Sequence, residues 1–415
     1  MKKYNIFVIL IMFLFLYEPP IFNINILHIL GLFSWIYIFI NYKNLAYIIK
    51  VDKVIYLYAF FIFAWTYILL ICLINSSAIA NSFHFVYWMI DIIPICISFC
   101  IYFTKKNYSF IDLMNILLVT GIVQATLALL SFYVPSVKEF FLSQLLDYGY
   151  RDVLVQLSDV RLFGFASNLT FSTPIVQSIL GVISLYLALN RNWKYIFFAP
   201  LLFFSGIINA RTSIVILLIG LLAIIFFVKK INVKTIVKTI IISFILILIS
   251  NLGLTIVEEK SYDTYKWIST GYEEIKTAIF EGTNQTEGYF SYINDVNKYV
   301  LPENFGLIFG VGERILTFNQ YGVRSDIGYI NDIWFGGFLY SILIYSLFIK
   351  LIFSMKAVNE SYDKLGSFLT ILFLGAFVVS NIKGYIFSMN NLTNLLFIIF
   401  SFTMFKKKLY SKKNR

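Results

Sequence analysis

Three arginines of this 415-residue chain stand where a charged residue is expensive. Arg161, in DVRLFGFASNLTFSTP, comes just before an apolar run, and Arg211, in SGIINARTS, lies in a very short turn between two such runs. Arg324, in GVRSDIGY, directly precedes a third. Guanidinium groups stay protonated and bind phosphate oxygens through two parallel hydrogen bonds. The three arginines therefore predict recognition of a diphosphate and stabilisation of charge on a leaving phosphate.

These arginines also have a structural interpretation. They could snorkel toward water, or pair with nearby acids such as Asp159 and Asp326 to hold helices together. That interpretation is strongest for Arg314, which directly follows Glu313 in FGVGER. The grouping of three arginines at the borders of apolar runs favours the functional interpretation for the set.

Carboxylates near the apolar runs have two interpretations each. Asp326 either caps the following helix, as Ser325 also could, or accepts a proton from a sugar hydroxyl or orients Arg324. Asp91 lies within an apolar run, which makes it a functional candidate by default. With Pro94 three residues on, Asp91 could instead satisfy a kinked backbone.

Glycines precede the late arginines. Gly310 and Gly312, followed by Gly322, would allow a tight loop whose backbone approaches a ligand. Gly306 and Gly310 are also four residues apart, a spacing that suits close helix packing instead.

The composition indicates which elements must position these residues. The chain is 60% hydrophobic and 13% charged, with a mean hydropathy of +0.81, whereas soluble domains carry about 25% charged residues. The long, unbroken apolar runs predict an all-α polytopic membrane protein. Twelve runs are long enough to count as spans: about 4–18, 22–41, 54–75, 86–103, 111–134, 172–190, 194–210, 212–228, 238–257, 327–349, 366–382 and 391–405.

The distribution of basic residues orients these spans. With a cytoplasmic N-terminus, 22 of the 33 Lys and Arg residues fall in cytoplasmic segments, as the positive-inside rule requires. Both termini are then cytoplasmic, and the net charge of +11 reflects topology and the basic tail, so nucleic-acid binding is unnecessary. Two histidines, and three cysteines without a zinc-binding pattern, predict no metal site.

Two long segments fall on the outer side, 135–171 and 258–326. We therefore expect an N-terminal bundle over 1–257, an extracytoplasmic loop over 258–326, and C-terminal helices with a basic tail over 327–415. Within the loop, apolar residues at helical spacing predict an amphipathic helix near 262–280 that lies on the membrane surface or over the bundle.

The chain resembles the Wzy-type polysaccharide polymerases of the O-antigen ligase/polymerase group. The resemblance covers about 155–340 and rests on four short motifs in the family's order. These are R-x-x-G…P (Arg161, Gly164, Pro174), N-A-R-T-S (Arg211, Thr212, Ser213), G-x-G (Gly310, Gly312) and S-D-x-G-Y followed by G-G (Ser325, Asp326, Gly328, Tyr329, Gly336, Gly337).

The resemblance implies a GT-C-like glycosyltransferase of the bacterial cytoplasmic membrane. It would join undecaprenyl-diphosphate-linked oligosaccharide repeat units into a surface polysaccharide at the outer face, without metal or cofactor, beside flippase and chain-length regulator proteins. The arginines Arg161, Arg211, Arg324 and Arg314 would bind the diphosphates. Asp326 or Glu313 would position or deprotonate the acceptor hydroxyl.

Two other functions share much of this chemistry. A related ligase would transfer finished glycan to a different acceptor, but the ligases' loop histidine has no counterpart here, which favours a polymerase. A flippase of lipid-linked oligosaccharides also needs cations for the diphosphate, but usually shows two similar halves. This sequence has no internal repeat.

Overall fold

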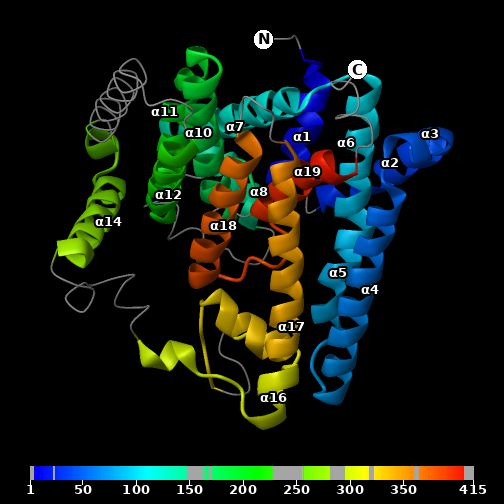
Figure 1. Cartoon of the computed structure of the whole chain (residues 1–415). Coiled ribbons are helices and arrows are strands. Elements are labelled where there is room, and N and C mark those ends of the chain that lie inside the picture. Colours follow the sequence, from blue (N-terminus) through cyan, green and yellow to red (C-terminus); the bar gives the residue numbers. More distant parts are fainter. Residues whose placement is uncertain are drawn as a thin grey trace. The chain divides into compact units, whose positions relative to one another are not determined.

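The computed structural model describes residues 4–21, 24–146, 161, 164–167, 171–227, 255, 257–280, 295–316, 322–358 and 364–405. Every regular element within these ranges is helical (Figure 1). The chain divides into two compact units that interleave along the sequence, and each is described by itself. Unit 1 comprises Met1–Ile26, Phe110–Glu273 and Val358–Ala376, and unit 2 comprises Leu27–Ser109, Glu274–Ala357 and Phe377–Arg415.

Within the described residues, six helical segments are long and apolar enough to cross a membrane. They are Val51–Ile74, Ile79–Lys105, Phe110–Tyr133, Ser172–Asn190, Gly328–Val358 and Leu365–Lys383. A seventh candidate is the pair α2 (Ile26–Ile40) and α3 (Tyr42–Ile48), which meet at a bend of 91°. The all-helical class is therefore confirmed, and several helices are long and apolar enough to cross a membrane, while twelve spans remain a prediction.

The other predicted spans coincide with shorter helices or lie outside the described ranges. Four apolar helices are too short to meet the same length criterion: Ile6–Tyr17, Trp193–Asn209, Thr212–Phe227 and Asn391–Met404. The predicted span 238–257 lies almost entirely outside the described residues. The sequence-based division at 257 and 326 concerns membrane topology and also remains a prediction.

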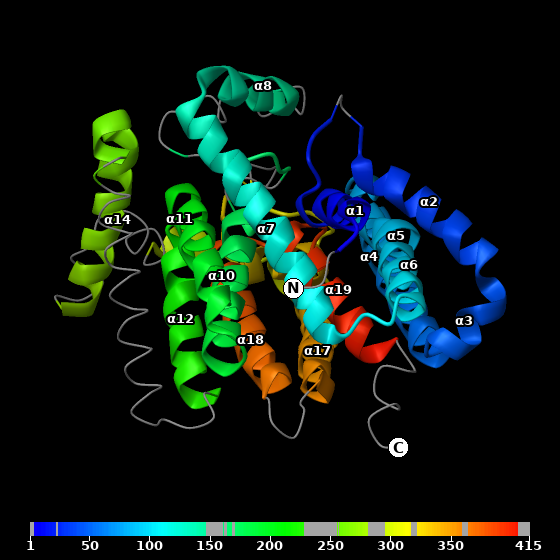
Figure 2. The ribbon, with the colours of Figure 1, turned by 90° about the horizontal axis from the view of Figure 1, so that it is seen from above.

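Unit 1 is a bundle around helix α10 (Ser172–Asn190). All residues of α10 from Ser172 to Ala188 are buried, as expected for a helix that is apolar on every side. It packs against α7 (Phe110–Tyr133), α11 (Ala199–Asn209) and α12 (Thr212–Phe227), which lie beside it in Figure 2. The unit also includes α1 (Ile6–Tyr17), α8 (Pro135–Leu146) and the 3-10 helix η3 (Trp193–Phe198).

Small residues let these helices approach closely. A Cβ on Gly181 of α10 would lie 2.8 Å from the Phe203 ring of α11. A Cβ on Gly220 of α12 would overlap the Val182 side chain. Each glycine thus leaves space for a side chain of the neighbouring helix, and small residues at such positions are typical of closely packed apolar helices.

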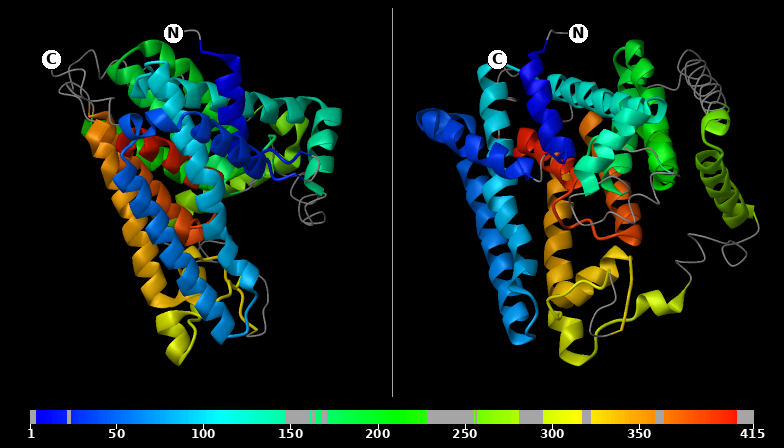
Figure 3. Two further views of the ribbon diagram at one scale, coloured as in Figure 1. Left: turned by 90° about the vertical axis from the view of Figure 1, so that its right-hand side faces the viewer. Right: turned by 180° about the vertical axis from the view of Figure 1, so that it is seen from behind.

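Unit 2 contains α4 (Val51–Ile74) beside a helical segment that changes type along its length. That segment runs from a 3-10 turn η1 (Ile79–Ser82) through α5 (Phe83–Tyr87) and a π-helical stretch η2 (Trp88–Ile92) into α6 (Ile93–Lys105) (Figure 3). Its other helices are α2, α3, α16 (Asn304–Phe309), α17 (Gly328–Phe353) and α19 (Asn391–Met404), with short 3-10 helices η5 (Val296–Tyr299) and η6 (Ser354–Val358). Helices α16 and α17 pack together, as do α6 and α19.

Four helical elements have residues in both units, namely α2, η6, α18 (Leu365–Lys383) and α14 (Tyr262–Phe280). Helix α14 confirms the predicted helix at 262–280. Thr264, Ile268 and Gly271 are buried while Asp263, Lys266 and Tyr272 are exposed, so it is also amphipathic.

Candidate functional site

Unit 1 brings two of the predicted arginines together around one indole ring. The guanidinium carbon of Arg161 lies 5.0 Å from the centroid of the Trp267 ring, and that of Arg211 also lies 5.0 Å from it. Both distances are within the range of a cation–π interaction. Trp267 of α14 therefore lies within cation–π range of both guanidinium groups, while their binding of a diphosphate remains a prediction.

Arg211 is fixed to the backbone of α14. Its Nη2 donates a 2.8 Å hydrogen bond to the carbonyl oxygen of Trp267. The side chain crosses the helix at Gly271, where a Cβ would lie 2.5 Å from Arg211 Cδ and 2.6 Å from Nε. The absence of a side chain at Gly271 thus allows Arg211 to dock on this face of α14.

The two arginines repel one another in a partly buried setting. Burial lowers the pKa of Arg161, and the charge of Arg211 lowers that pKa further. The Arg161 Nε is buried and has no hydrogen-bond partner among the described residues. Two like charges held around one ring, one with an unsatisfied donor, are complementary to an anion with several oxygen acceptors.

The NARTS turn is built by its smaller residues. Ser213 Oγ donates to the Pro174 carbonyl oxygen over 3.1 Å, which connects the turn to the start of α10. A Cβ on Gly206 would lie 3.0 Å from Ser178 Oγ and 3.1 Å from Ser213 Oγ, so α11 also approaches closely here. These contacts hold the backbone from which Arg211 extends, so Pro174 and Ser213 serve to position it.

In unit 2, the predicted glycine loop docks on a break in α17. Gly337 has φ 72° and ψ −174° inside this helix. The break frees backbone carbonyls, and the Trp334 and Phe335 carbonyls accept from the amides of Val311 and Gly312 over 2.8 and 3.0 Å. Gly310 and Gly312 both have positive φ, 84° and 81°.

The loop and the helix touch backbone to backbone. A Cβ on Gly310 would lie 2.5 Å from the Cα of Gly336. Tyr67 Oη donates to the carbonyl oxygens of both Phe309 and Gly336, over 3.1 and 3.0 Å. The glycines therefore allow the loop backbone to approach α17 closely, while its approach to a ligand remains a prediction.

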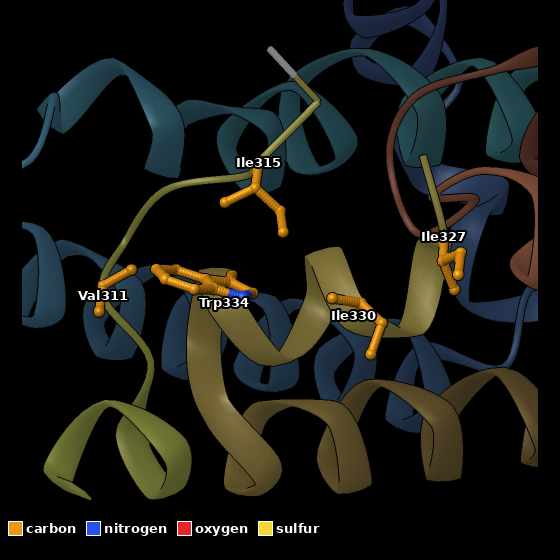
Figure 4. Close-up of a cluster of buried hydrophobic side chains, with 5 residues drawn as sticks. All are labelled: Val311, Ile315, Ile327, Ile330 and Trp334. Carbon is orange, nitrogen blue, oxygen red and sulfur yellow. The ribbon is translucent and has the colours of Figure 1, made fainter. Parts of the chain in front are cut away.

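The buried side chain of Asn331 links the backbone next to Arg314 to the backbone before α17. Asn331 Oδ1 accepts from the Ile315 amide over 2.8 Å, and its Nδ2 donates to the carbonyls of Ser325 and Ile327. Beside it, hydrophobic side chains gather between the loop and the first turns of α17 (Figure 4). This cluster comprises Val311, Ile315, Ile327, Ile330 and Trp334.

Arg314 lies between two aromatic rings of unit 2. Its guanidinium carbon is 4.0 Å from the Phe335 centroid and 4.5 Å from the Tyr385 centroid. Its charge acts on the carboxylate of Asp332, which is fully buried in α17. Its Nε and Nη2 are buried without a hydrogen-bond partner in the described chain, so the proposed pairing with Glu313 does not form.

The remaining predicted residues have different settings. Arg324 is exposed, and Asp326 and Glu313 are partly buried. The prediction that Asp326 or Ser325 caps the helix is wrong, because α17 begins at Gly328 with Ile327 at the N-cap position and no side-chain cap. Ser325 Oγ instead accepts from the Ile327 amide over 3.2 Å. Arg161 and Arg211 belong to unit 1 and Arg324 to unit 2, so convergence of all three remains a prediction.

The buried carboxylate of Asp91 in unit 2 contacts the exposed side chain of His28. Asp91 Oδ2 lies 2.6 Å from Nδ1 of His28, and Asp91 sits in the π-helical stretch rather than at a kink caused by Pro94. The wider π-helical turn leaves backbone carbonyls free to accept other hydrogen bonds. The Met89 carbonyl accepts from Tyr58 Oη, and the Ile90 carbonyl accepts from Trp35 Nε1. Such π-bulges are frequent at functional sites.

Sequence reasoning missed Asp332, His84 and the two aromatic residues that flank Arg314. Asp332 was detectable, because it lies inside an apolar run and an intramembrane acid is a functional candidate by default. His84 carried no comparable signal, since a single histidine near the start of a span is compatible with many roles.

Comparison with known proteins finds no matching protein-family model, no similar curated protein and no similar solved structure.

Proposed function

We propose that the chain is a membrane glycosyltransferase that polymerises lipid-linked oligosaccharide repeat units. It would join units carried on undecaprenyl diphosphate into a surface polysaccharide at the outer face of the bacterial cytoplasmic membrane. The growing chain leaves its carrier diphosphate and passes to a sugar hydroxyl of the next unit. The reaction needs no nucleotide sugar, metal or cofactor.

The observation that carries this proposal is the pair Arg161 and Arg211 around Trp267. A diphosphate presents several oxygen acceptors and more than one negative charge. It therefore matches two neighbouring guanidinium groups, whose like charges repel one another. The resemblance and the positions at the borders of apolar runs both indicate that these arginines bind a diphosphate. Their contacts with Trp267 support this role independently.

The proposal includes the finer architecture expected from the sequence. Twelve spans, cytoplasmic termini and a GT-C-like arrangement would place the arginine pair at the outer headgroup level. Arg324 would bind a second diphosphate, and Asp326 or Glu313 would position the acceptor hydroxyl. Flippase and chain-length regulator proteins would supply and limit the substrate.

The test is the length distribution of the surface glycan in cells that carry Arg211→Lys or Arg161→Lys. Lysine keeps the charge but loses the two-pronged hydrogen bonding, so a phosphate-binding role predicts a ladder that collapses to one repeat unit on the outer face. Arg191→Lys changes an exposed arginine of the same unit and should leave the ladder normal.

Other distributions would identify other functions. Normal ladders in both variants, at wild-type protein levels, would refute the phosphate-binding assignment. Single units trapped on the inner face would indicate a flippase. Full-length chains that stay on their lipid carrier would indicate a ligase.

A further inference from the structure

Besides Tyr340 Oη and Asn381 Oδ1, four buried polar atoms around Arg314 lack hydrogen-bond partners in the described part of unit 2. Two are donors, Nε and Nη2 of Arg314. These nitrogens form one edge of the guanidinium fork and can grip two adjacent oxygen atoms at once. The other two are Oδ1 of Asp332 and Nε2 of His84. Burial without a partner costs free energy that a ligand or an ordered water would recover.

His84 presents an acceptor at its unpartnered nitrogen. Its Nδ1 lies 2.9 Å from the Asn81 carbonyl oxygen. A carbonyl only accepts, so Nδ1 carries the hydrogen, and Nε2 of the neutral ring then holds the lone pair. The imidazole lies 5.4 Å from the Phe335 ring, measured between centroids, and Arg314 contacts the same Phe335 ring.

Asp332 is oriented by a relay of hydrogen bonds. Tyr345 Oη donates to its Oδ2 over 2.9 Å, and Asn381 Nδ2 donates to Tyr345 Oη over 3.0 Å. Tyr345 therefore uses its hydrogen on Asp332 and accepts from Asn381. The second carboxylate oxygen, Oδ1, remains available to accept a hydrogen bond.

The balance of charge distinguishes this cluster from the arginine pair of unit 1. Arg314 and Asp332 carry opposite charges and compensate one another, whereas Arg161 and Arg211 carry the same charge. A diphosphate near Arg314 would meet the repulsion of Asp332. The complementary ligand is neutral and offers both acceptors and donors at close spacing.

We propose that Arg314, Asp332 and His84 bind neighbouring hydroxyl groups of a neutral sugar residue. Two hydroxyl oxygens accept from the guanidinium fork, and their hydrogens are donated to Asp332 Oδ1 and His84 Nε2. The four atoms are buried, so a sugar reaches them when the Arg314 side chain or its loop moves aside. Assigning this sugar to the acceptor glycan rests on the proposed function, whereas the binding itself does not.

The experiment measures glycoside binding to the full chain in lipid nanodiscs by saturation-transfer NMR. The probes are the methyl glycosides of glucose, galactose, mannose and N-acetylglucosamine, with methyl glucuronide and inorganic pyrophosphate for comparison. At least one neutral glycoside should bind, and its affinity should fall at least tenfold in Arg314→Lys and Asp332→Asn. Glu303→Gln, which removes an exposed carboxylate of the same unit, should bind as the wild type does.

Several results would overturn the proposal. One is that no neutral glycoside binds, and another is that the glycoside affinity is unchanged in Arg314→Lys. A third is tighter binding of the glucuronide than of the neutral glycosides. A fourth is that pyrophosphate displaces the glycoside from the wild type but not from Arg314→Lys. If no neutral glycoside binds, ordered water is the partner of these buried atoms. Melting curves of each variant confirm that it is folded. Glycoside binding together with normal glycan ladders in Arg211→Lys would refute the polymerase and leave the sugar site intact.

Discussion

Replacing Gly271 with alanine tests whether α14 holds Arg211 in place. A Cβ at this position would lie 2.5, 2.6 and 2.9 Å from Arg211 Cδ, Nε and Cγ, all closer than van der Waals contact allows. The arginine must therefore shift and give up its 2.8 Å hydrogen bond to the Trp267 carbonyl oxygen. Its position at the Trp267 ring changes as well.

The expected cost follows from these contacts. Losing a hydrogen bond from a charged donor costs about 1.5–3 kcal/mol, and weakening a cation–π contact costs about 0.5–1 kcal/mol. Alanine in a helix interior recovers about 1 kcal/mol relative to glycine. We therefore expect Gly271→Ala to destabilise the fold by about 1–3 kcal/mol, against the usual effect of this substitution in a helix.

The assay compares melting temperatures and pyrophosphate binding of the purified protein. Gly271→Ala should melt below the wild type and bind pyrophosphate about tenfold more weakly, because the two arginines no longer share one position. Thr270→Ala, at the exposed neighbouring position, gains helix propensity without touching Arg211 and should melt no lower than the wild type. If Gly271→Ala melts higher and keeps wild-type anion affinity, Arg211 is not docked on α14 and the reasoning fails.

Three further predictions concern the same sites. Pyrophosphate should raise the melting temperature of the wild type more than that of Arg161→Gln, because the anion relieves the repulsion that, together with burial, lowers the pKa of Arg161; equal shifts would contradict this. Gly337→Ala should lower the free energy of unfolding by at least 3 kcal/mol, because its Cβ would overlap the Ile308 carbonyl oxygen in addition to about 1–3 kcal/mol of backbone strain. Gly322, with φ 67°, has open space around it, so Gly322→Ala should show the backbone strain alone. Thermal unfolding of both variants compares the two costs. His28→Ala should lower the melting temperature by leaving the Asp91 carboxylate buried without its partner, and adding Asp91→Asn should restore most of the loss; additive effects would show that the two do not interact.

Sequence patterns predicted the helices and part of the site well, for physical reasons. Apolar runs give helices because backbone groups in hydrocarbon must be satisfied within the segment. At 262–280, apolar residues recur every three to four positions, which predicts an amphipathic helix. Arg161 and Arg211 were found because a charge at the border of an apolar run needs a compensating interaction. Their common ring, Trp267, was one of several loop aromatics and carried no distinguishing signal.

The breaks in the helices could not be predicted from local sequence. Gly337 interrupts α17 because Val311, Gly312 and Tyr67 supply donors for the carbonyls that the break frees. The π-helical stretch at Asp91 likewise depends on donors from Tyr58 and Trp35. A glycine pair or an acid in an apolar run permits such a break. Whether the break forms depends on residues distant in the sequence, which must donate hydrogen bonds to the backbone carbonyls that it frees.

Tertiary contacts also place the predicted arginines in different electrostatic surroundings, which their sequence positions do not distinguish. In the sequence, each is an arginine beside or between apolar runs, and a single explanation covers the set. In the fold, Arg161 has a like charge as its neighbour, Arg314 has the opposite charge of Asp332, and Arg324 is exposed. The ligand that satisfies a guanidinium depends on the net charge around it, because a buried site binds best what brings that charge close to zero. The unit 1 pair therefore favours a multiply charged phosphate, and the Arg314 cluster of unit 2 favours a neutral polyol.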